Sequence, residues 1–132
     1  MNDLINAIDQ VIEENDLPFE WSKGIAAEIK KLKHKKEFKN RIDLRSQPFV
    51  TIDGKDAKDF DDAIFCREEP NGFMLQVAIA DVADIVREET EIDFEALKRG
   101  TSIYFPKRVI PMLPEEISNN LCSLVPKEDR NV

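Results

Sequence analysis

Five aspartates lie within ten residues near the middle of the chain, and only Lys55 and Lys58 offset their charge. They are Asp53, Asp56, Asp59, Asp61 and Asp62. Carboxylates packed this closely repel one another, so a folded loop of this composition favours a bound cation. Aspartate offers hard oxygen ligands, which suit Mg²⁺, Mn²⁺ or Ca²⁺ rather than zinc. A divalent-cation site is therefore the first chemistry that these residues indicate.

The spacing of the aspartates indicates that the loop could hold two divalent cations side by side. Asp53 ends an apolar, β-branched stretch, whereas Asp59, Asp61 and Asp62 begin the next ordered segment. If the intervening loop folds back, four carboxylates converge, and such a set can hold two Mg²⁺ about 4 Å apart. Two metals at that separation support in-line displacement at a phosphoryl group.

Other interpretations of the loop stay open at this point. An acidic surface turn without any ligand explains the composition equally well. A calcium loop of the EF-hand type fits poorly, because the required alternation and the closing glutamate are missing. An aspartyl-phosphatase start also fits poorly, because Gly54 and Lys55 follow Asp53 where that motif needs a second aspartate two residues on.

The elements that must position this loop form an α+β pattern, with helices first and a mainly antiparallel sheet afterwards. Apolar periodicity predicts helices over residues 3–14 and about 21–36. β-branched and aromatic residues predict strands over 49–52, 63–66, 73–80 and 102–105, with a hairpin turn at 70–72. A short helix over 93–99 should end at Gly100, and a helical turn should cover 115–120.

Length, composition and charge exclude several classes of protein. The chain has 132 residues, 42% of them apolar, which is enough for a core and excludes wholesale disorder. Its net charge is −8, and its uncharged stretches are too short to span a bilayer, so no membrane contact is expected. Without a signal-peptide pattern or CxxC spacing, Cys66 and Cys122 are predicted to be reduced, buried thiols in a cytoplasmic protein.

A series of motifs continues beyond the aspartates. In chain order it reads Val50-Thr-Ile-Asp53, Asp59-Phe-Asp-Asp-Ala63, Val77-Ala-Ile-Ala-Asp-Val82, Arg99-Gly-Thr-Ser-Ile-Tyr-Phe-Pro106, Val109-Ile-Pro-Met-Leu-Pro114 and Leu121-Cys-Ser-Leu124. This series resembles the RNase II/RNase R (RNB) family. Arg41-Ile-Asp-Leu-Arg45 and the Gly100-Thr-Ser-Ile-Tyr104 phrase are closer to the ribonuclease R branch than to RNase II proper.

The resemblance implies a domain organisation. Residues 1–40 resemble the helical connector that precedes the catalytic domain in this family. Residues 41–132 resemble the N-terminal part of the RNB-type catalytic domain, a truncated portion of a mixed, mainly antiparallel β core.

The resemblance also implies an activity and its residues. It implies a 3′-to-5′ exoribonuclease that hydrolyses single-stranded RNA to nucleoside 5′-monophosphates with Mg²⁺, or with Mn²⁺ as a substitute, by two-metal catalysis. The family's metal-binding aspartates fall on Asp53, Asp59, Asp61 and Asp62, and Asp61 is the one most critical for cleavage. The aromatic residue that stacks on the 3′-terminal base falls on Tyr104.

The chain departs from the family in length. The cold-shock-type domains that normally precede the catalytic domain, the S1-type domain that follows it and a later arginine-bearing segment are absent from this sequence. We therefore expect a fragment of a larger enzyme, inactive by itself. A non-catalytic RNA-binding or structural adaptor derived from the same family is the alternative.

Three further charged residues have less specific interpretations. Asp81 and Asp84 are expected to cap the segment that follows the strand ending at Ala80, in preference to an outer role at the metal site. For Arg108, contact with a phosphate and simple solvation are equally compatible with the sequence.

Overall fold

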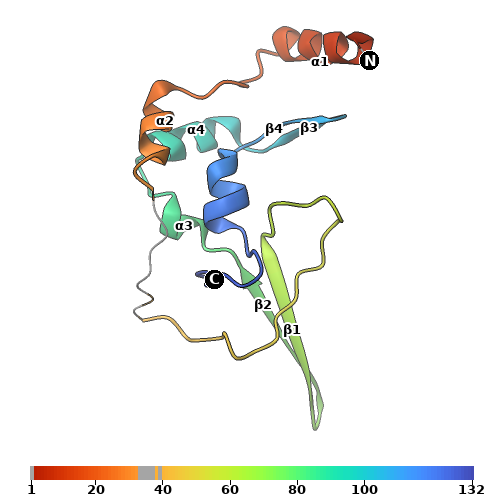
Figure 1. The fold of residues 1–132 in the computed structure, drawn as a ribbon, viewed down its shortest axis with the longest axis vertical. Helices are drawn as coiled ribbons and strands as arrows, with labels where there is room; N and C mark the ends of the chain where they lie inside the picture. The colour runs from red at the N-terminus through yellow and green to blue at the C-terminus, as the bar shows by residue number, and fades with distance from the viewer. Residues whose placement is uncertain (1, 33–37, 39) are drawn as a thin grey trace. The chain divides into compact units, whose positions relative to one another are not determined.

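The structure, a computed structural model, describes residues 2–32, 38 and 40–132 and divides into two compact units (Figure 1). The first, which we name the helical unit, combines Met1–Lys31 with Glu89–Pro114. The second, the hairpin unit, combines Leu32–Glu88 with Glu115–Val132. Helices and antiparallel strands occur together, which confirms the α+β class.

The helical unit packs its helices with a short sheet. Its elements are α1 (Asn2–Glu14), α2 (Lys23–Ile29), α4 (Glu91–Arg99), β3 (Ile103–Phe105) and β4 (Arg108–Ile110). Ile8 and Ile12 lie on the same face of α1, because residues four apart are neighbours on a helix. Both are buried in one cluster with Ile110 of β4, and Ile103 and Phe105 pack against that cluster. This small core joins the antiparallel β3–β4 pair to α1.

Local signals set the ends of α4. The Thr90 side chain accepts a hydrogen bond from the Asp93 N–H (3.3 Å), and Gly100 ends the helix with a φ of 71°. That left-handed conformation costs glycine little because it has no Cβ. In the last turn the Arg99 guanidinium donates to the Glu20 carbonyl (2.9 Å) and lies 3.6 Å from the centre of the Trp21 ring. The end of α4 is thereby tied to the segment before α2.

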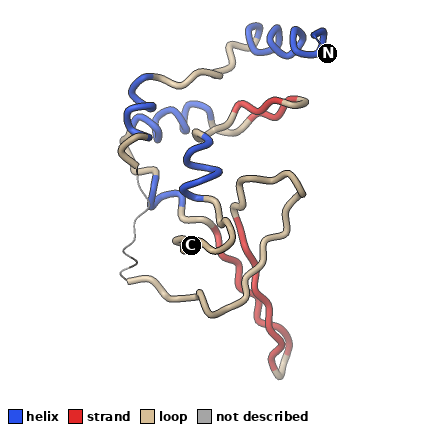
Figure 2. The backbone as a smooth tube through the Cα atoms, in the orientation of Figure 1, coloured by secondary structure: helices blue, strands red, loops and turns tan. Residues whose placement is uncertain are grey.

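The hairpin unit contains the longest strands among the described residues. Its elements are β1 (Asp62–Glu69), β2 (Gly72–Ile79), α3 (Val82–Ile85) and the π-helix η1 (Glu116–Cys122). β1 and β2 pair antiparallel over their whole length, from Asp62↔Ile79 to Glu69↔Gly72. Figure 2 shows this hairpin as a long twisted ribbon, with an extended loop leading into β1. The aspartate cluster lies in that loop and at the start of β1.

Several predicted elements are confirmed, with shifted ends. The hairpin around residues 70–72 and the helix ending at Gly100 are present as predicted. The predicted strand over 49–52 is wrong in extent, because only Val50 pairs, with Ile64.

Two helices differ from the sequence expectation. α2 ends at Ile29, well before the predicted end near residue 36, where the sequence becomes lysine-rich; residues 33–37 lie outside the described part of the chain. The helical turn predicted over 115–120 is the π-helix η1, which runs on to Cys122. Such helices are rare and occur often at functional sites. β4 had no counterpart among the predicted strands.

The two cysteines are both free, but only Cys122 is buried. The prediction that Cys66 is buried is wrong, because its side chain lies on the exposed face of β1 opposite Leu75, which is 60% exposed. In the described residues, the helices are too short or too polar to cross a membrane.

This difference in burial predicts selective thiol chemistry. With a water-soluble maleimide, the native chain is expected to react at Cys66 and not at Cys122, and both should react after unfolding. Peptide mapping by mass spectrometry measures the two sites separately. Equal labelling of both thiols in the native chain would contradict the burial of Cys122.

Candidate functional site

The loop that leads to β1 has little regular structure of its own. Asp53 follows the single Val50–Ile64 bridge, and the next turn is closed by a hydrogen bond from the Ala57 N–H to the Gly54 carbonyl (3.0 Å). Asp59 follows this turn in an extended segment, and its side chain is exposed. The carboxylates of Asp53 and Asp59 are thus carried by loop backbone and not by a strand.

The other two carboxylates are anchored to the hairpin. Asp62 is the first residue of β1 and pairs with Ile79. The Asp61 carbonyl accepts a hydrogen bond from the Ala80 N–H (2.8 Å), directly after β2. The sheet therefore fixes the backbone of Asp61 and Asp62, while both residues remain largely, though for the Asp61 carboxyl not fully, exposed.

Electrostatic coupling joins the four predicted metal ligands. Partial burial raises the pKa of the Asp61 carboxyl, and the negative charges of Asp59, Asp62 and Asp53 raise it further. Burial also raises the pKa of the Cys122 thiol to about 11, with a further contribution from the Asp61 charge. The negative charges of the other three carboxylates therefore all act on the pKa of the Asp61 carboxyl. The Cys122 thiol, which stays neutral at pH 7, lies close enough to feel the Asp61 charge.

These residues suit a hard divalent cation in donor chemistry. All four side chains are carboxylates, and a cation would relieve the repulsion that raises the Asp61 pKa. In the described part of the chain, however, no group of three or more histidine, cysteine or acidic side chains is already arranged to hold a metal ion. The carboxylates share one neighbourhood, and a cation would have to draw them to ligand distance.

Tyr104 belongs to the helical unit, whereas the aspartates belong to the hairpin unit. It lies on β3, opposite Val109 of β4, and its side chain is 72% exposed. The ring therefore offers an open face that a planar ligand can stack on.

The other charged residues singled out from the sequence have structural partners. The Asp81 side chain accepts a hydrogen bond from the Asp84 N–H (3.2 Å) as the N-cap of α3, and it forms an ion pair with Arg41. The capping role expected for Asp81 is confirmed. Arg108 forms an ion pair with Asp9 (2.6 Å) within the helical unit, so its guanidinium already has a carboxylate partner.

Two residues to which the sequence assigned no role, Ser123 and Arg130, hold the loop in place. Ser123 is fully buried, and its hydroxyl bonds to the backbone beside Asp59. In the sequence Ser123 belongs to the Leu121-Cys-Ser-Leu124 motif, where it is a single hydroxyl within an apolar run, but the motif assigned it no role. Arg130, whose side chain is 9% exposed, carried no signal at all.

Comparison with known proteins gives one matching family. The RNB domain matches residues 41–132. Ribonuclease R of Buchnera aphidicola is 51% identical over 130 residues, and that of Escherichia coli is 49% identical over 128 residues. Each alignment covers 94% of this chain but only 18% and 16% of the respective relative. The chain thus spans less than a fifth of the length of these two curated relatives.

Solved structures agree with the sequence match. The structure of Mycoplasma genitalium RNase R in complex with double-stranded RNA matches with a TM-score of 0.91 and 42% identity, over 97% of this chain and 23% of that one. The same protein in complex with ribose-methylated single-stranded RNA matches with a TM-score of 0.90 and 42% identity, over 97% of this chain and 20% of that one.

Proposed function

The chain belongs to the RNB-domain family, and on that premise we propose that it carries the metal-binding carboxylate loop of a 3′-to-5′ exoribonuclease. The proposed reaction is hydrolysis of single-stranded RNA to nucleoside 5′-monophosphates. The observation that supports it most is the placement of the four motif aspartates, with Asp61 and Asp62 anchored at the start of the hairpin and Asp53 and Asp59 in the loop that leads to it. We place this activity in the cytoplasm, where free thiols persist.

The proposed ligands of the metal are Asp53, Asp59, Asp61 and Asp62. When bound there, Mg²⁺ or Mn²⁺ would supply Lewis-acid charge and an acidified water in a two-metal arrangement. Without such charge the four carboxylates repel the phosphates of RNA, as does the net charge of −8. The hairpin fixes the backbone of Asp61 and Asp62, and thus of half of the proposed ligand set, before a cation arrives.

Tyr104 is the proposed contact for the 3′-terminal base. An exposed aromatic ring stacks on any base, because every base has a π face. This contact tolerates all sequences, as an enzyme that shortens RNA stepwise requires.

A chimaera tests the proposed function directly. The matching segment of Escherichia coli ribonuclease R is replaced by this chain, and the protein is incubated with single-stranded RNA labelled at its 5′ end. We expect shortening from the 3′ end with release of nucleoside 5′-monophosphates, loss of activity with a chelator and recovery with Mg²⁺. The 132-residue chain alone should release none. A folded chimaera that binds RNA without cleaving it would support the adaptor alternative, and internal cleavage would contradict an exonuclease.

The stacking role of Tyr104 makes a separate prediction. Tyr104→Ala in the chimaera should raise KM about 5- to 150-fold, because stacking on one base contributes roughly 1–3 kcal/mol. Tyr104→Phe keeps the ring and should stay close to the unsubstituted chimaera. Steady-state kinetics on short single-stranded RNA measures both, and an unchanged KM for Tyr104→Ala would remove Tyr104 from the substrate site.

A further inference from the structure

Ser123 bridges two backbone groups on either side of Asp59. Its hydroxyl accepts a hydrogen bond from the Phe60 N–H (2.9 Å) and donates one to the Lys58 carbonyl (3.1 Å). The residue has 0% exposure. A hydroxyl can donate one proton and accept in the same geometry, so a single buried side chain satisfies both groups.

The same segment makes a third bond to the loop. The Leu124 N–H donates to the Phe60 carbonyl (2.9 Å), so both polar backbone groups of Phe60 are bound by the two residues that follow η1. Among the described residues 53–61, the other backbone hydrogen bonds are the Gly54–Ala57 turn and the bond from the Ala80 N–H to the Asp61 carbonyl. The position of Asp59 therefore depends on the Ser123 segment.

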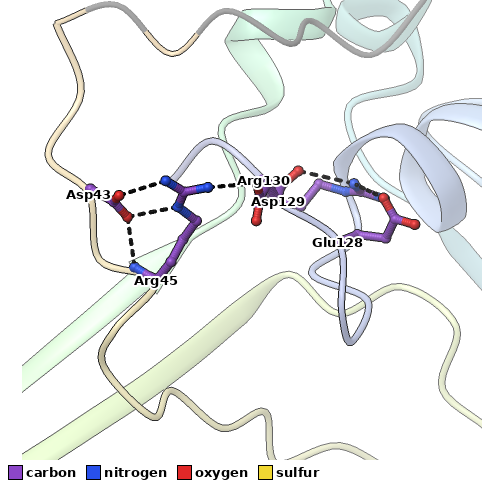
Figure 3. A network of polar contacts seen from close by, with 5 residues as sticks. All are labelled: Asp43, Arg45, Glu128, Asp129 and Arg130. Carbon is purple, nitrogen blue, oxygen red and sulfur yellow. Dashed lines mark hydrogen bonds and ion pairs between the residues drawn. The ribbon is translucent and has the colours of Figure 1, made fainter.

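Ser123 is itself held from its other side. The Arg130 guanidinium donates to the carbonyls of Ser123 (3.1 Å) and Asn120 (3.2 Å), at the end of η1. It also donates to the Asp129 carbonyl, and Figure 3 shows its ion pair with Glu128. In the same network Arg45 pairs with Asp129 and with Asp43, and its hydrogen bonds lower the pKa of the Asp43 carboxyl to about 2. Arg130 thus fixes the backbone from which the Ser123 hydroxyl reaches the loop.

Burying a hydroxyl has a free-energy cost unless its hydrogen bonds are made. An alanine at position 123 would avoid this cost, but it would leave the Phe60 N–H and the Lys58 carbonyl without the Ser123 hydroxyl as a partner. The buried serine is therefore best explained by what it holds, which is the backbone on both sides of a proposed metal ligand.

We propose that Ser123 is a positioning residue for the carboxylate loop, holding Asp59 and its neighbour Asp61 where a divalent cation can use them. This inference rests on the proposed function, because it deepens the assignment of the metal site. Ser123 itself touches neither metal nor substrate in this role.

Ser123→Ala in the 132-residue chain tests the proposal with two measurements. The Phe60 amide should exchange with deuterium about 2- to 12-fold faster, as expected for the loss of one hydrogen bond. Binding of Mn²⁺ alone, followed by electron paramagnetic resonance, should weaken about 10- to 100-fold, as for other groups that orient metal ligands. Ser123→Cys keeps nearly the same shape with a weaker donor, and it replaces the alanine variant if that variant does not fold.

Ser102→Ala is the matched control. The Ser102 hydroxyl also holds a backbone amide, that of Met112 (2.9 Å), but within the helical unit. The Ser102→Ala variant should lose about as much free energy of unfolding as Ser123→Ala, while the exchange rate of the Phe60 amide and the Mn²⁺ affinity stay unchanged. If the unsubstituted chain binds Mn²⁺ and Ser123→Ala behaves like Ser102→Ala in either measurement, the positioning role is wrong.

A further variant separates this inference from the proposed function. If the unsubstituted chain binds Mn²⁺ no better than the Asp53→Asn/Asp62→Asn double variant, the proposed metal site fails. Exchange at Phe60 then decides by itself whether Ser123 holds the loop.

Discussion

Asp61→Asn is expected to lower kcat of the chimaera by about 10²- to 10³-fold, the usual loss when one preorganised electrostatic group is removed from an active site. Asparagine keeps the shape of the side chain and removes its charge. Asp61 is the carboxylate at which burial and the charges of Asp53, Asp59 and Asp62 act together, so its charge is the one most dependent on a cation. Single-turnover release of nucleoside monophosphates measures the loss.

Folding should survive this substitution. The raised pKa of Asp61 means that the folded chain disfavours its charged form, so neutralising it should leave the thermal midpoint unchanged or slightly raised. Asp56→Asn is the matched control, because Asp56 lies in the same exposed loop but outside the predicted ligand set. Equal activity of the Asp61 and Asp56 variants would contradict the assignment of Asp61.

Divalent cations are expected to stabilise the 132-residue chain itself. A ligand that binds only the folded form at ten times its Kd adds about 1.4 kcal/mol to the free energy of unfolding. For a chain of this size that raises the thermal midpoint by several degrees. We expect weak binding, because the carboxylates are not yet arranged as a ligand set. Mn²⁺ should bind more tightly than Mg²⁺, which gives up its bound waters reluctantly. Thermal unfolding followed by circular dichroism across a MnCl₂ titration measures it.

The control for this effect is charge screening. The rise should vanish in the Asp53→Asn/Asp62→Asn double variant, and KCl at matched ionic strength should not reproduce it. If KCl stabilises the chain as well as MnCl₂ does, the loop is only an acidic surface turn in this chain.

Much of the local structure could be predicted because its causes are local. The apolar strand-forming residues 73–80 and the Pro70-Asn71-Gly72 turn predict the β1–β2 hairpin without knowledge of any distant residue. Gly100 likewise marks the end of α4, because a left-handed residue is needed there whatever the helix packs against. The candidate metal ligands were visible for the same reason, since they lie within ten residues of one another.

Other local predictions were wrong where contacts with residues distant in sequence determine burial or helix type. Cys66 was expected inside because its segment is apolar, yet a two-stranded hairpin leaves one face of that segment open. η1 was expected as a simple turn, and no sequence rule for helix propensity distinguishes a π-helix from an α-helix.

Motif order, apolar periodicity and side-chain chemistry can be recognised along the chain, so they were enough to assign the family, the α+β class and the candidate carboxylates. The contacts that hold those carboxylates in place became visible only in the folded chain. The Ser123 hydroxyl meets the Phe60 amide across 63 residues and the Lys58 carbonyl across 65, and Arg41 meets Asp81 across 40. Such pairs depend on how η1, the hairpin and the loop pack together, and hydrogen-bond geometry over that separation follows from packing and not from residue type.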